Sequence, residues 1–256
     1  MAANYGLLGE HLSHSYSKQI HEALADYTYD LIELSKEGLK DFMTAKDFAA
    51  VNVTIPYKRD VIPYLDEMDE RAKSIGAVNT VVNRNGKLYG YNTDYYGFLY
   101  TLTVHNIKIT GKKVVVLGNG GAAQAVLAVL RDLSAKEIVI VDIVPGEGVC
   151  TYDEVNRLHT DAAILVNTSP IGMYPKADAA PIDLTPFTEL TAVVDVIYNP
   201  EVTKLLSQAK DRGLIAVNGL QMLVSQAFYA VQHFLDTKLP EEKIEEVTKL
   251  IRKTLY

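Results

Sequence analysis

Hydrophobic residues follow two spacings that alternate along the chain. Runs of consecutive apolar residues are typical of buried strands, and apolar residues three or four positions apart are typical of one face of a helix. Because the two patterns alternate, the sequence predicts an α/β fold. The strands are expected over residues 5–9, 29–34, 51–55, 114–118, 138–142, 163–167, 192–198 and 214–218.

Two series of these elements predict two lobes, with the break near residues 105–111. Ligands of open α/β sheets bind beyond the carboxyl ends of the strands, so a cleft between the lobes is the expected site. Within the first series, Asn85 and Gly86 stand between two strand-like stretches. This pair favours a β-hairpin, because both positions of a two-residue turn need positive φ angles.

Composition and charge narrow the class of protein. The chain has 256 residues, 48% of them apolar, so it is long enough to bury a sizeable core. A net charge of −7 argues against nucleic acid or an anionic membrane as the main partner. The N-terminus lacks a signal-peptide pattern, and no apolar run reaches the roughly 20 residues needed to cross a bilayer. We therefore expect a soluble, cytoplasmic protein.

The segment KVVVLGNGGAAQAVLAVL places a glycine loop between a predicted strand and a predicted helix. Gly118, Gly120 and Ala123 have a spacing at which backbone N–H groups approach a pyrophosphate at the helix N-terminus. The alternative is a tight turn in an α/β protein that binds no nucleotide. The flanking strand and helix favour a dinucleotide site.

Polar residues near the ends of other predicted strands and helices are candidates for chemistry. Ser15 and Ser17 offer hydroxyl donors to a carboxylate or phosphate, although Ser17 also fits a helix N-cap. Lys58 is a candidate general base if it is partly desolvated, or else a solvated lysine that starts a helix. Asn79 and Asp94 each follow a strand-like stretch, and Asp94 also fits a helix cap. Their spacing does not show whether Lys58 and Asp94 meet.

The histidines and the cysteine point to no further site. His11, His14 and His21 lack the carboxylates or cysteines that would complete a metal site, so no metal is expected. The single cysteine, Cys150, excludes an intrachain disulfide, which suits a reducing compartment. We expect it to be a packed or exposed thiol without a functional role.

Seven segments spread over the chain carry a family resemblance. They are HSYS, VNVTIPYK, GAVNT…GYNTD, GNGGAA, NTSPIGM, DVIYNP and GLQMLVSQA, in this order. The chain resembles the shikimate dehydrogenase family from end to end. The resemblance implies a substrate-binding catalytic domain formed by residues 1–104 and 220–256. It also implies a Rossmann-like dinucleotide domain over residues 105–219, shortened between 143 and 163.

The resemblance further implies NADPH-dependent reduction of 3-dehydroshikimate to shikimate, in aromatic amino-acid biosynthesis, by a monomer or homodimer. Lys58 and Asp94 would form the catalytic pair. The substrate would be bound by Ser15, Ser17, Thr54, Asn79, Thr93, Tyr198 and Gln226. The cofactor would be bound by Gly118, Asn119, Gly120, Gly121, Ala122, Asn167, Thr168, Ser169, Gly219 and Met222.

The choice of cofactor is where residues and family disagree. Family members that use NADP usually carry an arginine after the second strand of the dinucleotide domain, where this chain reads VDIVPGEG. Asp142 lies 24 residues beyond Gly118, near the spacing at which an acid binds a ribose 2′-hydroxyl. An acid there repels a 2′-phosphate, and residues 137–156 contain no Lys or Arg. Asp142 therefore favours NAD, whereas the family favours NADP.

The same region is too short for a complete dinucleotide domain. Only 21 residues separate Asp142 from Ile164. One crossover takes at least about 10–12 residues and an average strand about 5–6, so two crossovers and a strand do not fit comfortably. We expect one β-α unit to be missing, with the segment CTYDEVNRL as a short surviving helix.

Three functions remain open at this point. The first is an active shikimate dehydrogenase, which the Lys58–Asp94 pair favours. The second is an NAD-dependent quinate/shikimate dehydrogenase, which Asp142 favours. The third is a shikimate-binding protein with impaired cofactor binding, which the shortened domain favours.

Overall fold

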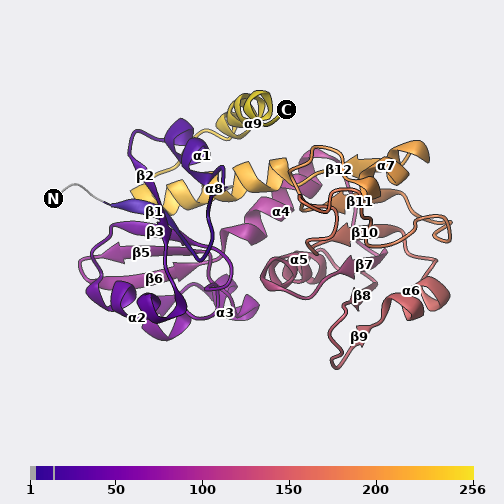
Figure 1. The fold of residues 1–256 in the computed structure, drawn as a ribbon, viewed down its shortest axis with the longest axis horizontal. Helices are drawn as coiled ribbons and strands as arrows, with labels where there is room; N and C mark the ends of the chain where they lie inside the picture. The colour runs from indigo at the N-terminus through magenta and orange to yellow at the C-terminus, as the bar shows by residue number, and fades with distance from the viewer. Residues whose placement is uncertain (1–3, 14) are drawn as a thin grey trace. The chain divides into compact units, whose positions relative to one another are not determined.

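The computed structural model describes residues 4–13 and 15–256 and confirms the α/β class. The chain divides into two compact units. Unit 1 comprises Met1–Gly97 and Val224–Thr254, and unit 2 comprises Phe98–Leu223 and Leu255–Tyr256. Each unit is built on its own sheet (Figure 1).

The sheet of unit 1 has the strand order β2-β1-β3-β5-β6-β4. β1 is parallel to β2 and β3, whereas β3, β5 and β6 pair antiparallel. Its strands are β1 (Tyr5–Gly9), β2 (Tyr29–Glu33), β3 (Ala50–Val53), β4 (Glu67–Met68), β5 (Thr80–Arg84) and β6 (Lys87–Tyr91). The helices whose residues lie wholly or mainly in this unit are α1 (Ser17–Leu24), α2 (Lys36–Ala45), α3 (Glu70–Ile75), α8 (Leu220–Leu235) and α9 (Glu242–Leu255).

Apolar side chains on both faces of this sheet are buried, because successive residues of a strand point to opposite faces. Leu8 packs in a cluster with Leu39 of α2, whereas its neighbour Leu7 packs in a cluster with Phe234 of α8. Figure 1 accordingly shows α2 and α3 on one side of the sheet and α8 on the other. The predicted hairpin is confirmed: β5 and β6 are joined by Asn85 and Gly86, at φ 54° and 84°.

The sheet of unit 2 is parallel throughout, with the order β12-β11-β10-β7-β8-β9. The order reverses between β7 and β10, which is where doubly wound sheets bind their ligands. Its strands are β7 (Lys113–Leu117), β8 (Glu137–Val141), β9 (Val149–Cys150), β10 (Ile164–Asn167), β11 (Ala192–Asp195) and β12 (Ile215–Val217). The helices are α5 (Gly121–Asp132), α6 (Tyr152–Leu158) and α7 (Lys204–Asp211), and α4 (Thr93–Val104) spans the boundary between the units along the chain.

The expectation that a whole β-α unit is missing after β8 holds for the helix and is wrong for the strand. A third strand survives as the two-residue β9, which pairs with β8. Residues 142–148 between them form bends and turns without a helix, so the missing part is the crossover helix and most of the strand. The predicted short helix is α6, and Thr151 and Glu154 cap it with reciprocal hydrogen bonds.

Across residues 4–13 and 15–256, no helix is both long and apolar enough to cross a membrane.

Candidate functional site

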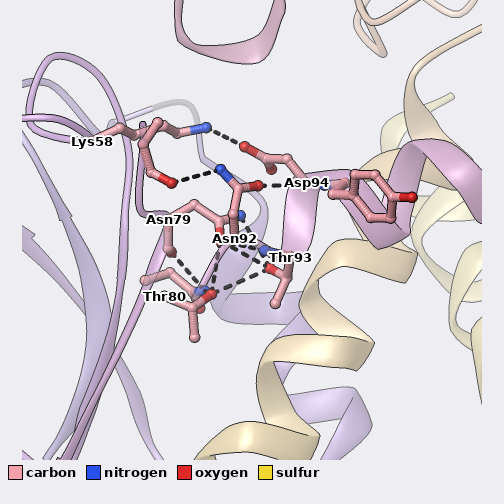
Figure 2. A network of polar contacts seen from close by, with 9 residues as sticks. Lys58, Asn79, Thr80, Asn92, Thr93 and Asp94 are labelled. Carbon is pink, nitrogen blue, oxygen red and sulfur yellow. Dashed lines mark hydrogen bonds and ion pairs between the residues drawn. The ribbon is translucent and has the colours of Figure 1, made fainter. Parts of the chain in front are cut away.

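The structure brings Lys58 and Asp94 together in unit 1. Lys58 lies in the turns that follow β3, and Asp94 lies in the first turn of α4. Lys58 Nζ is 2.5 Å from Asp94 Oδ2 (Figure 2). The two side chains are only 14% and 10% exposed, and the Lys58 carbonyl is fixed by the N–H of Val78 at 2.8 Å. The pair is therefore a charged, partly desolvated hydrogen bond in a fixed position.

Two alternative interpretations of these residues are wrong. Lys58 does not start a helix, because residues 55–61 form consecutive turns. Asp94 does not cap α4, because the side-chain oxygen of Asn92 accepts the N–H of Tyr95 at 3.4 Å. Asn92 Nδ2 also donates to the carbonyl of Ala77 at 2.9 Å. Sequence analysis missed Asn92, although an Asn directly before a helical stretch is a capping signal.

A buried network of neutral groups lies beside the pair, as Figure 2 shows. Asn79 Oδ1 accepts the backbone N–H of Thr93 at 2.7 Å and the hydroxyl of Thr80 at 2.9 Å. Asn79 Nδ2 donates to Thr93 Oγ at 3.0 Å. Asn52 extends the network by donating to Thr80 Oγ at 3.0 Å and accepting from Tyr29 Oη at 2.7 Å. These bonds fix the amide orientation of Asn79.

The serine pair lies at the start of α1. Ser15 Oγ donates to Ser17 Oγ at 3.1 Å and accepts the N–H of Ser17 at 3.2 Å. Ser17 is not the N-cap, because it is the first helical residue and Tyr16 holds the cap position without a side-chain bond. Among the described residues, no hydrogen bond joins this pair to Asn79 or Thr93. The side chains of Thr54 and Gln226 are half-buried in the same unit.

A second buried group in unit 1 is His21, which sequence analysis considered only as a metal ligand. Its Nδ1 lies 2.8 Å from Tyr27 Oη, and its ring stacks on that of Tyr29 at 4.0 Å. Burial lowers the pKa of His21 to about 3, against an opposing contribution from the Asn52 side chain. The ring is therefore neutral at pH 7.

In unit 2, the glycine loop joins β7 to α5 through a tight turn. Gly118 has φ 99°, and a Cβ there would lie 2.8 Å from Thr168 Oγ. Gly120 is the N-cap of α5, which begins with Gly121 and Ala122. The loop leaves backbone N–H groups at a helix N-terminus, as anion binding requires.

Asp142 holds two loops at once. Its Oδ2 accepts the N–H of Asn119 in the glycine loop at 2.7 Å, and its Oδ1 accepts the N–H of Val144 at 2.9 Å. The side chain is half-buried. A carboxylate has about four lone-pair sites, so Asp142 retains capacity for further donors such as ribose hydroxyls.

The remaining predicted residues of unit 2 lie at the end of β10 and directly after it, after β11, and directly before or within the first turn of α8. Asn167 Oδ1 accepts from Ser169 Oγ at 2.7 Å, and the hydroxyl of Thr168 donates to the carbonyl of Leu117 at 2.8 Å. Gly219 leaves no room for a side chain, because a Cβ would lie 1.9 Å from the carbonyl oxygen of Val196. Tyr198 is half-buried and accepts a hydrogen bond on its carbonyl from Tyr256, and Met222 is buried.

Within 4–13 and 15–256, no group of three His, Cys, Asp or Glu residues could hold a metal ion. His14 lies outside the described residues. Cys150 is half-buried in β9, with its Sγ 3.8 Å from His159 Nε2.

Comparisons with known proteins identify the family of the chain. Residues 7–81 match the family model of the shikimate dehydrogenase substrate binding domain. The chain is 41% identical to the shikimate dehydrogenase (NADP(+)) of Clostridium beijerinckii, over 93% of this chain and 95% of that protein. It superposes with a TM-score of 0.94 on a chorismate mutase/shikimate 5-dehydrogenase fusion protein from Clostridium acetobutylicum, at 38% identity, covering 100% and 99% of the two chains.

A further solved structure is informative about ligands. The shikimate 5-dehydrogenase of Thermus thermophilus, in complex with NADP(H) and shikimate, gives a TM-score of 0.85 at 30% identity, covering 96% of this chain and 98% of that one. The identity to curated relatives extends over nearly the whole length of both proteins. This chain belongs to the shikimate dehydrogenase family.

Proposed function

We propose that the protein interconverts 3-dehydroshikimate and shikimate with a nicotinamide cofactor. The observation that carries the proposal is the 2.5 Å contact of Lys58 Nζ with Asp94 Oδ2. A reduction of this kind needs a proton on the carbonyl oxygen as hydride reaches the carbon, and a bound nicotinamide cofactor supplies that hydride. Lys58 gives the proton, and Asp94 orients the ammonium group by accepting one of its hydrogens. In the reverse direction the same amine takes the proton from the shikimate hydroxyl.

The substrate is a small anion with several hydroxyls, which suits the donors present. Ser15 and Ser17 bind its carboxylate. Asn79 and Thr93 lie next to Asp94 in the structure, and their orientation is fixed by the neutral network. The hydroxyls of the substrate are read by Thr54, Asn79, Thr93, Tyr198 and Gln226.

The residues of unit 2 fit a dinucleotide. Gly118 has a positive φ and approaches Thr168 so closely that a side chain would collide, so the tight turn before the N-terminus of α5 requires glycine there. The pyrophosphate is bound by Gly118, Asn119, Gly120, Gly121 and Ala122. Asn167, Thr168 and Ser169 lie beside the bound dinucleotide, and Gly219 and Met222 lie beside the nicotinamide.

We further propose that NAD is preferred to NADP. Two of the relatives named above carry NADP(+) in the name or are described in complex with NADP(H). In this chain, Asp142 already sits against the glycine loop, and a second negative group at the ribose would be repelled by its carboxylate. Residues 137–156 contain no Lys or Arg to offset that repulsion.

The first experiment is the initial rate of shikimate oxidation by the purified full chain, with NAD⁺ and NADP⁺ supplied separately. Faster turnover with NAD⁺ supports both proposals. Faster turnover with NADP⁺ supports the enzyme and overturns the role of Asp142 in selectivity. Absence of turnover with either cofactor, in folded protein that binds shikimate, overturns the enzymatic proposal.

The two other functions are less favoured. The relatives are named as shikimate dehydrogenases, which gives no support to a quinate enzyme or a non-enzymatic binding protein. Quinate tested beside shikimate in the same assay separates the first of these. A cytoplasmic location and a monomeric or homodimeric state remain predictions.

A further inference from the structure

Asp195 is a buried carboxylate to which the proposed chemistry gives no role. It is the last residue of β11 and has no exposed surface. Burial raises its pKa to about 6, although hydrogen bonds from Thr203, Ile197 and Asn167 act in the opposite direction. An ionised carboxylate that is fully buried destabilises the fold, because burying a charge costs free energy unless hydrogen-bond donors replace the lost water.

The three donors come from different segments of the chain. Asp195 Oδ1 accepts from Asn167 Nδ2 at 3.0 Å and from the N–H of Ile197 at 3.1 Å. Asp195 Oδ2 accepts from Thr203 Oγ at 2.7 Å. Asn167 is the last residue of the neighbouring strand β10, and its own side-chain oxygen holds Ser169 in the loop that follows. One carboxylate thus joins the end of β10, the loop after β11 and the start of α7.

The bonds continue from these loops to the other proposed cofactor residues. The carbonyl of Ile197 accepts the N–H of Gly219 at 2.9 Å, directly before α8. Thr168, next to Asn167, donates its hydroxyl to the carbonyl of Leu117 and packs against Gly118. Asp195 is therefore connected, within unit 2, to three of the segments that are proposed to lie along the dinucleotide, those of Asn167, Gly219 and Gly118.

We propose that Asp195 is a positioning residue for the dinucleotide, which holds the loops after β10 and β11 in their binding conformation through three hydrogen bonds. The inference rests on the proposed function, because it concerns the same cofactor site. It adds a residue that does not itself contact the cofactor.

An amide of the same shape does not replace this carboxylate. Thr203 Oγ already accepts the N–H of Leu206 at 3.2 Å and uses its hydrogen for Asp195. If the amide nitrogen of an Asn faced Thr203, the hydroxyl hydrogen would lose its acceptor. If it faced the other side, the donors of Asn167 and Ile197 would lose theirs. Either orientation leaves a buried polar group unsatisfied.

The test is Asp195→Asn in the full chain, with Asp183→Asn as a matched control. Asp183 is an exposed carboxylate of unit 2 that also accepts from a threonine, the hydroxyl of Thr185 at 2.8 Å. We expect the Kd and KM for the preferred dinucleotide to rise about 10-fold or more in Asp195→Asn, since a lost bond to a charged group corresponds to roughly that factor. The Kd for shikimate rises by a smaller factor than the Kd for the dinucleotide, because Tyr198 is the one proposed shikimate ligand in the loop after β11 and the others lie in unit 1.

A second pair of variants decides the matter if Asp195→Asn does not fold. Thr203→Val removes the donor to Asp195 and weakens dinucleotide binding, whereas Thr203→Ser keeps the hydroxyl and restores it. Unchanged dinucleotide affinity in Asp195→Asn, or an equal loss of shikimate affinity, overturns the inference and leaves the proposed function standing. Failure of the unchanged protein to bind NAD⁺ or NADP⁺ overturns both.

Discussion

The buried polar network of unit 1 consists of neutral groups, whereas that of unit 2 is centred on a carboxylate. In unit 1 the network around Asn79 and Thr80 consists of amides and hydroxyls, and the charged pair of Lys58 and Asp94 lies at its partly exposed side. In unit 2 the network is centred on the carboxylate of Asp195, which is fully buried and bound by neutral donors. Neutral groups are suited to hydrogen bonding with substrate hydroxyls. A buried carboxylate needs several hydrogen-bond donors, and because these come from different loops, it fixes the loops relative to one another.

The two networks differ in how much free energy the loss of one hydrogen bond costs. Hydrogen bonds to a charged group contribute about 1.5–3 kcal/mol, compared with about 0.5–1.5 kcal/mol for neutral ones. The neutral network of unit 1 is therefore expected to tolerate the loss of one member better than the network around Asp195. Three predictions, in order of decreasing effect, test this contrast.

The largest effect is expected for Lys58→Ala, which removes the charged pair and leaves the neutral network intact. We expect kcat for shikimate oxidation to fall about 10²–10⁴-fold, the usual contribution of a positioned acid or base. The Kd for shikimate, measured by calorimetry, stays largely unchanged. Lys73→Ala is the control, because Lys73 forms an exposed pair with Glu70 at 2.7 Å in the same unit. A near-normal rate in Lys58→Ala would remove this lysine from the mechanism.

An intermediate effect is expected for two matched threonine variants. Thr203→Val deletes a bond to the Asp195 carboxylate and the N-cap of α7, and is expected to cost about 2–4 kcal/mol of unfolding free energy. Thr80→Val deletes bonds between neutral groups only and is expected to cost about 1–3 kcal/mol. Urea unfolding, read in each unit by hydrogen–deuterium exchange mass spectrometry, gives both values. Thr→Ser at each position keeps the hydroxyl, and a larger loss for Thr80→Val than for Thr203→Val contradicts the contrast.

The smallest effect is a pair of opposite pH dependences. The pKa of His21 is lowered from 6.5 to about 3, so only the unfolded chain takes up its proton below pH 6.5, and His21 lowers stability on acidification. The pKa of Asp195 is raised from 3.8 to about 6, so Asp195 is protonated at a higher pH in the folded protein than in the unfolded chain. Its contribution to the free energy of unfolding therefore increases as the pH falls from 6 to 3.8. Each contributes at most about 1.4 kcal/mol per pH unit.

Non-titrating variants separate the two contributions. Between pH 6 and pH 4.5, the unfolding free energy of the unchanged protein should fall relative to His21→Gln and rise relative to Asp195→Asn. Urea unfolding at a series of pH values measures both differences. Parallel curves for either variant would mean that its residue has the same pKa in the folded and unfolded states.

Much of the fold was predictable because local patterns determined it. The β5–β6 hairpin followed from Asn85 and Gly86, whose φ angles are positive as the turn requires. The shortening after Asp142 followed from chain length alone, since a crossover helix has a minimum size. The two-residue strand β9 could not be predicted from the sequence, because two residues carry no periodic hydrophobic pattern.

The site was less predictable where it depends on tertiary contacts. Lys58 and Asp94 are 36 positions apart, and their meeting depends on long-range hydrogen bonds, from the N–H of Val78 to the Lys58 carbonyl and from the N–H of Thr93 to Asn79, rather than on any local pattern. Asn92 and Asp94 both suit a helix cap, and the exact start of α4 decides between them. Asp195 stands in an apolar strand, where a charge is unusual, but only the loops around it show which donors it serves.

The double attachment of Asp142 has a consequence for protein engineering. The residue that is expected to discriminate between cofactors also ties the glycine loop to the shortened loop, through Asn119 and Val144. A substitution of Asp142 therefore changes cofactor preference and loop conformation together in this chain. If Asp142 alone were replaced to convert the preference from NAD to NADP, the loop that is proposed to bind the pyrophosphate would lose a hydrogen bond. A new acceptor for the N–H of Asn119 has to be introduced in the same step.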